Sequence, residues 1–191
     1  MSIFGIFRRD PMRDWPECRP VPLVFDLSRG ELNGIPFEAP TERLRGLGRP
    51  AAFRELSPHS RAACYPALGL EIELSTARSP EWVESFVCLF RPPGADPRAG
   101  KGAAPRSCEI VLQPEEGEGV RVTAGTTLQE AERHFGRGAL HADEDGSVLQ
   151  ATAGGVWLYF DFDSGGRLRI LEIEHPDDPE EHMSRSRSDP Y

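Results

Sequence analysis

The chain has 191 residues, 38% of them hydrophobic, so it is long enough to bury a substantial core. Its 31 acidic and 22 basic side chains give a net charge of −9 at pH 7. This excess argues against sequence-independent nucleic-acid binding, which needs a basic surface, and against docking on an anionic membrane. An acidic surface suits solubility or a basic protein partner instead.

The first half of the chain is predicted to form one lobe, residues 21–91. Residues 1–20 are charged and contain prolines, which predicts a flexible N-terminal arm. A strand is expected at 21–27 with a return strand that starts at Glu31-Leu32, and a short helix at 41–47 with Pro40 in its first turn and Gly48 after its end. Three further strands are expected at 62–65, 68–76 and 82–90.

A segment rich in Pro, Gly and Ala at 92–106 is predicted to be a linker to a second lobe, residues 107–174. Thr126 or Thr127 caps the expected helix of this lobe, which ends before Gly136. The remaining 175–191 are rich in Pro, acidic residues, Ser and Arg, which predicts a disordered tail. Strands are expected at 108–112, 120–122, 148–151, 156–162 and 168–174, with a hairpin turn at 163–166.

The two halves read as an internal duplication. Gly48 and Gly136 end the two expected helices 88 residues apart, and Gly69 and Gly155 open apolar strands 86 residues apart. Each half has the order ββαβββ. The sequence therefore predicts an α+β protein of two similar lobes, each an antiparallel β-meander with one short helix packed on it.

The second half carries the residues of a family resemblance. Gly-Thr-Thr at 125–127, Phe-Gly-Arg at 135–137 and the aromatic strand at 157–162 resemble the repeating unit of the BamE/SmpA-like outer-membrane lipoproteins. The tandem arrangement is also similar to that of the β-lactamase inhibitor proteins. Residues 47–50 and 70–74 match the unit more weakly. The resemblance implies a tandem fold and a protein-binding function.

Two departures limit what the resemblance implies. Those families are exported, whereas the N-terminal MSIFGIFRRD is too short for a signal sequence and no lipobox precedes Cys18. The inhibitor repeats also carry disulfides, which the cysteine positions here do not match. More loosely, a small, acidic, β-rich chain without a leader resembles the immunity proteins of bacterial toxin systems.

The cysteines and the hydrophobic runs bear on location. Cys18, Cys64, Cys88 and Cys108 form no Cys-x-x-Cys pair, which favours reduced thiols in a cytosol. Cys88 and Cys108 flank the linker and would close it as a disulfide only in an oxidising compartment. No run reaches the roughly 18 apolar residues of a membrane span. The expected location is the cytoplasm.

The sequence shows no convincing catalytic, cofactor or metal motif. The five histidines form no zinc spacing, and no P-loop, GxGxxG or GxSxG is present. The stretch 141–146 lacks the ligand spacing of a calcium loop. Glu71 and Glu73 are typical of the wet face of an amphipathic strand, although a glycosidase also pairs carboxylates. We therefore expect no enzyme activity, no cofactor and no metal.

A protein-binding surface is the remaining hypothesis. Residues 108–174 hold 13 acidic and 5 basic side chains, against 9 and 8 in 21–91. This excess is either a solvated face or an electrostatic docking face. Trp157 and Tyr159 share one side of their strand and are either displayed or packed between the lobes. The candidate partner-binding residues are Trp157, Tyr159, Asp143, Glu144 and Asp145.

The functional hypothesis is a non-enzymatic inhibitor or immunity protein that neutralises a basic toxin or enzyme. A structural or assembly adaptor of the BamE type is the first alternative. An uncharacterised enzyme is the second. Charge composition predicts no nucleic-acid and no membrane partner, and the oligomeric state stays open.

Overall fold

The computed structural model describes residues 12–77, 79–90, 106–142 and 146–175. Within them the chain forms strands and two short helices, the 3-10 helix η1 (Thr41–Leu47) and the α-helix α1 (Leu128–Phe135). The strands, in chain order, are β1 (Leu23–Asp26), β2 (Glu31–Leu32), β3 (Ile35–Pro36), β4 (Ala52–Ser57), β5 (Ser60–Tyr65), β6 (Leu70–Ser75), β7 (Trp82–Leu89), β8 (Ile110–Gln113), β9 (Val120–Val122), β10 (Ala139–Ala142), β11 (Gly146–Ala153), β12 (Val156–Asp163) and β13 (Leu168–Glu174).

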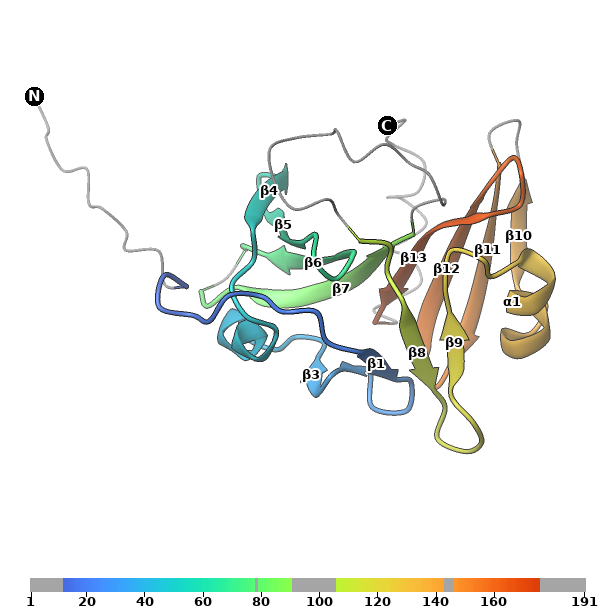
Figure 1. The fold of residues 1–191 in the computed structure, drawn as a ribbon, viewed down its shortest axis with the longest axis horizontal. Helices are drawn as coiled ribbons and strands as arrows, with labels where there is room; N and C mark the ends of the chain where they lie inside the picture. Colours follow the sequence, from blue (N-terminus) through green and yellow to red (C-terminus); the bar gives the residue numbers. More distant parts are fainter. Residues whose placement is uncertain (1–11, 78, 91–105, 143–145, 176–191) are drawn as a thin grey trace, which may run out of the picture.

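The strands form two sheets, and each sheet combines strands from both halves of the chain (Figure 1). The five-stranded sheet has the order β3-β2-β1-β8-β9, with β1 and β8 parallel. The eight-stranded sheet has the order β10-β11-β12-β13-β7-β6-β5-β4 and is antiparallel throughout. Its two four-stranded meanders join where Phe86 of β7 lies opposite Ile173 of β13.

The predicted α+β fold of two lobes is therefore wrong. Strands make up 49% of the described residues and helices 10%, so this part of the chain is mostly β and its layers are sheets. The physical reason lies at β7 and β13, the last strand of each meander. Left as edges, both would present a row of unpaired backbone groups, and pairing them with each other satisfies those groups. Helices of seven and eight residues cover too little apolar surface to complete two separate lobes.

The predicted helix boundaries are confirmed. Thr127 caps α1 and forms a capping box with Glu130, in which each side chain accepts a bond from the other residue's backbone N–H. Gly48 and Gly136 follow the two helices with φ of 89° and 84°. A Cβ at Gly48 would lie 2.8 Å from the Cys18 backbone, so this position also requires glycine for close packing. The strands β4 and β10, directly after the helices, were not predicted.

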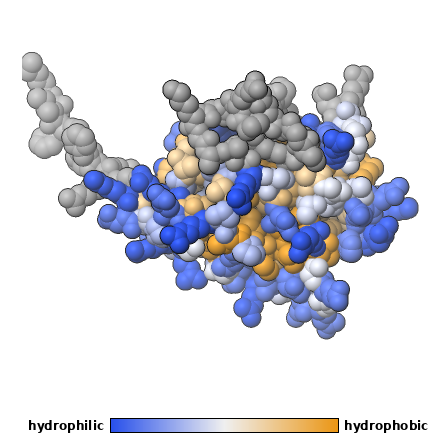
Figure 2. Space-filling view, viewed as in Figure 1, coloured by the Kyte–Doolittle hydropathy of each residue, from blue (hydrophilic) through white to orange (hydrophobic). Residues whose placement is uncertain are grey.

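One apolar core lies between the two sheets. The strand β12 alternates strictly, with Leu158 and Phe160 fully buried and the residues between them partly exposed. Phe25 of β1 meets Phe86 of β7 across the core at 5.6 Å between ring centroids, and Phe135 of α1 stacks on Phe160 at 5.3 Å. Figure 2 shows hydrophilic residues at the two flanks of this view and apolar ones gathered between them.

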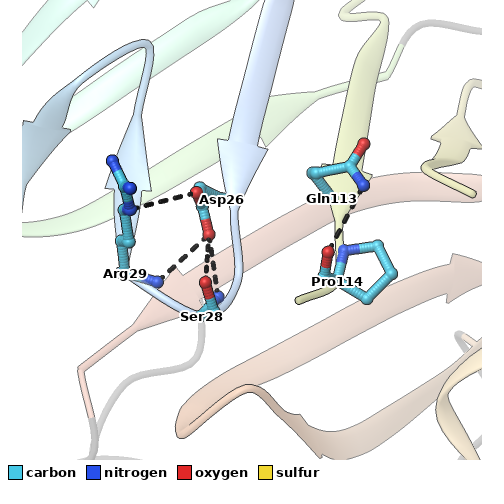
Figure 3. A network of polar contacts seen from close by, with 5 residues as sticks. All are labelled: Asp26, Ser28, Arg29, Gln113 and Pro114. Carbon is cyan, nitrogen blue, oxygen red and sulfur yellow. Dashed lines mark hydrogen bonds and ion pairs between the residues drawn. The ribbon is translucent and has the colours of Figure 1, made fainter. Parts of the chain in front are cut away.

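A carboxylate fixes the turn that follows β1 (Figure 3). One oxygen of Asp26 accepts bonds from the Ser28 hydroxyl at 2.7 Å and from the backbone N–H groups of Ser28 and Arg29 at 3.0 and 3.1 Å. The Ser28 hydroxyl and these N–H groups lower the pKa of Asp26. Beside this turn the Leu27 N–H donates to the Gln113 carbonyl, which extends the parallel pairing of β1 and β8.

Part of the predicted N-terminal arm packs against the fold. Met12 is only 2% exposed, and the Pro16 carbonyl accepts a 2.7 Å bond from the Arg49 N–H. Most of the predicted linker, 92–105, and all but the first residue of the predicted tail, 176–191, lie outside the described residues.

Candidate functional site

The tetrapeptide Leu-Glu-Ile-Glu occurs twice, at residues 70–73 in β6 and 171–174 in β13. The strand β7 lies between these two strands and pairs with both. The Leu and Ile side chains of each copy are buried in the core, at 0–1% exposure. Because side chains alternate along a strand, all four glutamates point to the opposite side of the sheet, around β7.

We call this side, which points away from the five-stranded sheet, the outer face. Register places Ser85 of β7 opposite Glu73 and Glu174, and Val87 opposite Glu71 and Glu172. Trp157 and Tyr159 of β12 lie directly opposite Glu174 and Glu172. Around β7 the outer face thus carries Glu71, Glu73, Ser85, Val87, Trp157, Tyr159, Glu172 and Glu174.

On the outer face, the surroundings of Glu73 and Glu172 favour the protonated form of each side chain over the ionised form. Burial, with the nearby charges of Glu172 and Glu84, raises the pKa of Glu73 to about 7. Burial and the adjacent Glu174 raise the pKa of Glu172 to about 7 as well. Since an ordinary glutamate titrates near 4.3, both side chains exchange protons close to neutral pH. Perturbed carboxyl groups of this kind cluster at functional sites.

Ser85 lies at the centre of these carboxyl groups. Its hydroxyl is close enough to Glu73 and Glu172 to favour their ionised forms, yet it makes no hydrogen bond of good geometry. The Oγ atom of Ser85 and the Oη atom of Tyr65 are the two buried side-chain oxygens without a partner in the described part of the chain. A buried hydroxyl left unsatisfied costs about 1–3 kcal/mol, so this position calls for an explanation.

A basic residue borders the acidic group on one side. Arg54 of β4 forms an ion pair with Glu71, and its charge also acts on Glu73. The Cys64 thiol donates a bond to the other oxygen of Glu71 at 3.6 Å. Glu71 is therefore held by partners within the sheet, whereas mainly negative neighbours act on Glu73 and Glu172.

The aromatic residues predicted as contacts border the other side. Trp157 and Tyr159 are partly exposed, and their rings meet edge to face at 6.3 Å. The Gln150 amide donates to the Tyr159 hydroxyl at 3.5 Å, and burial raises the pKa of this phenol. Neither ring lies in the core between the sheets, so the interpretation that packs them between two lobes does not describe this fold.

The acidic triplet predicted with them, Asp143, Glu144 and Asp145, lies outside the described residues. It follows β10 and precedes β11, two strands that pair with each other. Its role as a steering surface stays a prediction.

A hollow of about 300 Å³ lies between β9 and α1, away from the outer face around β7. Arg121, Arg133, His134 and Phe135 contribute to its walls. In the described part of the chain, no three His, Cys, Asp or Glu side chains come close enough together to hold a metal ion. Neither described helix has the length and hydrophobicity to span a bilayer.

The two cysteines that flank the linker are neighbours in the fold. Cys88 and Cys108 are both buried free thiols. A hydrogen bond between them, together with burial, raises the pKa of Cys88 well above its usual range. The two thiols, which the sequence predicts to be reduced, are therefore close enough to form a hydrogen bond, and a raised pKa disfavours the reactive thiolate.

Sequence reasoning noticed Glu71 and Glu73 and missed Ser85, Glu172 and Glu174. The available signal was the repeated Leu-Glu-Ile-Glu, which marks two strands with the same inner and outer sides. The repeat alone does not show that β7 lies between its two copies. That neighbourhood depends on pairing between strands 80 or more residues apart.

Comparison of the chain with protein-family models, with curated proteins and with solved structures gave no match.

Proposed function

We propose that this chain is a cytoplasmic, non-enzymatic protein-binding protein, an inhibitor or immunity protein that neutralises a basic toxin or enzyme. The observation that carries the proposal is the composition of the outer face, where Trp157 and Tyr159 stand directly opposite Glu174 and Glu172. Aromatic anchors beside carboxylates suit a partner surface that is both apolar and positively charged.

On this face, charged and aromatic residues would contribute to binding in different ways. The net charge of −9 attracts a basic partner and raises its rate of association. The rings of Trp157 and Tyr159 supply contact area, and desolvated aromatic anchors of this type contribute about 2 kcal/mol or more each when central to an interface. The carboxylates then select for positive charge.

Comparative affinity capture from the native host tests the proposal. Wild-type protein, a Trp157→Ala/Tyr159→Ala double variant and a Val24→Ala control serve as baits, since Val24 is 40% exposed on β1 of the other sheet. We expect a basic protein, identified by mass spectrometry, that wild type and control enrich and the double variant loses. The purified partner's activity should fall on addition of wild type. Equal capture by all three baits, or a partner whose activity is unchanged, contradicts the proposal.

A further inference from the structure

The centre of the outer face has the character of an incomplete site. Ser85 is 3% exposed, and its side chain points to the side of the sheet opposite the core residue Phe86. Its hydroxyl has no well-aligned partner among the described residues. Because an unsatisfied buried hydroxyl destabilises the fold, its place between two carboxyl groups indicates a ligand that completes the hydrogen bonding.

The charges around Ser85 indicate that this ligand carries a positive charge. Glu172 and Glu84 both act on Glu73, and Glu174 acts on Glu172, each raising the pKa of its neighbour. Arg54 offsets only part of this negative charge, since it is paired with Glu71. A cation placed over Ser85 would relieve the repulsion and replace the water that the carboxylates have lost.

The spacing of the groups defines the size of the ligand. Neighbouring strands lie about 4.8 Å apart, and same-side residues about 6.6 Å apart along a strand. Consistent with such a spread, the described carboxylates form no group of three tight enough for a metal ion. A larger, planar cation with several donors fits carboxylates that are separated in this way.

We propose that Glu73, Glu172 and Ser85 form a subsite for the guanidinium group of an arginine side chain on the basic partner, an inference that rests on the function proposed above. The guanidinium has five N–H donors in a rigid fork, enough to reach both carboxylates and the Ser85 Oγ atom. Trp157 and Tyr159 lie one strand beyond Glu174 and Glu172, where an arginine stem or a second cation contacts a ring face. A second copy of this chain is a poor occupant, because two chains of charge −9 repel each other.

Binding at this subsite is coupled to protons. Arginine favours the ionised carboxylates, so it lowers their pKa and releases protons below about pH 7. Affinity therefore rises as the pH increases from 6 to 8, by about tenfold if one of the two carboxylates must ionise. The charged or titratable groups that face the pair from β4, β6, β7, β12 and β13 are Arg54, Glu71, Glu84, Tyr159 and Glu174.

The test uses the full chain and arginine amide as the probe, with the ¹³C signals of the glutamate carboxyl groups followed by NMR. We expect arginine amide to shift the signals of Glu73 and Glu172 and to lower their pKa, while citrulline amide, in which an uncharged urea replaces the guanidinium, has a much smaller effect. A Glu73→Gln/Glu172→Gln variant should bind the probe at least about tenfold more weakly. Glu42→Gln, an exposed carboxyl on η1, is the matched control and should bind as wild type does.

Three results would overturn the subsite. The first is that the probe leaves both carboxyl signals unmoved, and the second is that the Gln double variant binds it as well as wild type. The third is a change in the titration of Glu73 or Glu172 on replacing Arg185 and Arg187 by Gln, which would make the chain's own C-terminal segment the occupant. None of these three results would contradict the proposed protein-binding function. The capture experiment tests that function through Trp157→Ala/Tyr159→Ala, and its outcome does not depend on this arginine.

Discussion

The two sides of the eight-stranded sheet use the same strands for different purposes. On the inner side, Ile72, Phe86 and Phe160 are fully buried in the core. On the outer side, the alternate positions of these strands carry carboxylates, an unsatisfied hydroxyl and two partly exposed aromatic rings. The inner side is arranged for stability. The outer side keeps charges that stability alone disfavours, which is typical of a surface retained for binding.

The largest expected effect is on the inner side. Phe160→Ala removes a fully buried ring that stacks on Phe135, so it should lower the free energy of unfolding by about 3–5 kcal/mol. Trp157→Ala on the outer side of the same strand should cost about 1 kcal/mol. Urea unfolding followed by circular dichroism measures both values. Similar losses for the two variants would show that the outer side is also core.

The next effect concerns pH. A glutamate whose folded-state pKa is about 7 binds more protons in the folded than in the unfolded state, so stability falls as pH rises from about 4.5 to 7 and stays reduced above. Glu73→Gln or Glu172→Gln should therefore stabilise the protein at pH 8, by about 1–3 kcal/mol, and have little effect at pH 4. Denaturant midpoints at both pH values measure this, with Glu42→Gln as the control. A loss of stability at pH 8 would mean that these carboxylates are well paired.

On the outer side, binding and stability should separate. Trp157→Ala should weaken capture of the partner by about 2 kcal/mol, roughly thirtyfold, if the ring is central to the interface. Its melting temperature should stay within a few degrees of wild type. Titration calorimetry with the purified partner and a thermal melt give the two values. Full affinity together with a large drop in melting temperature would contradict a contact role.

The smallest effect is expected at the predicted steering residues. Reversing the charges of Asp143, Glu144 and Asp145 should slow association several-fold at low salt and change dissociation little. Added salt should reduce the difference, since exposed charges are screened beyond about 10 Å at 0.1 M. Stopped-flow association at two ionic strengths measures this. An unchanged rate at low salt would exclude the triplet from the encounter.

Local features were predictable from the sequence because their causes are local. The Thr127 to Glu130 capping box, the positive φ of Gly48 and Gly136 and the turn at Asp163 depend on residues a few positions apart. The arrangement of the sheets was not predictable in the same way. No residue pattern near β7 or β13 predicts that these two strands pair. Their pairing joins the two expected lobes into one mostly β fold.

The candidate site divides in the same manner. The alternation in β12 predicted that Trp157 and Tyr159 share a side distinct from Leu158 and Phe160, as the structure has them. The group around Ser85 was beyond reach, because it needs the two Leu-Glu-Ile-Glu strands to flank β7. The alternation within a strand predicts which of its residues share one side of the sheet. Pairing between distant strands determines which residues of different strands lie next to each other.

The most direct measurement is a ¹³C NMR titration of the glutamate carboxyl groups in the full chain, from pH 4 to 9, assigned with the Gln variants. The account predicts that Glu73 and Glu172 titrate near pH 7, well above the value near 4.3 of an ordinary glutamate. If Glu73 and Glu172 also titrate below about pH 5, their carboxylates are well solvated or paired. The outer face would then be an ordinary wet side of a sheet, and the central claim that it is held ready for a cationic partner would be contradicted.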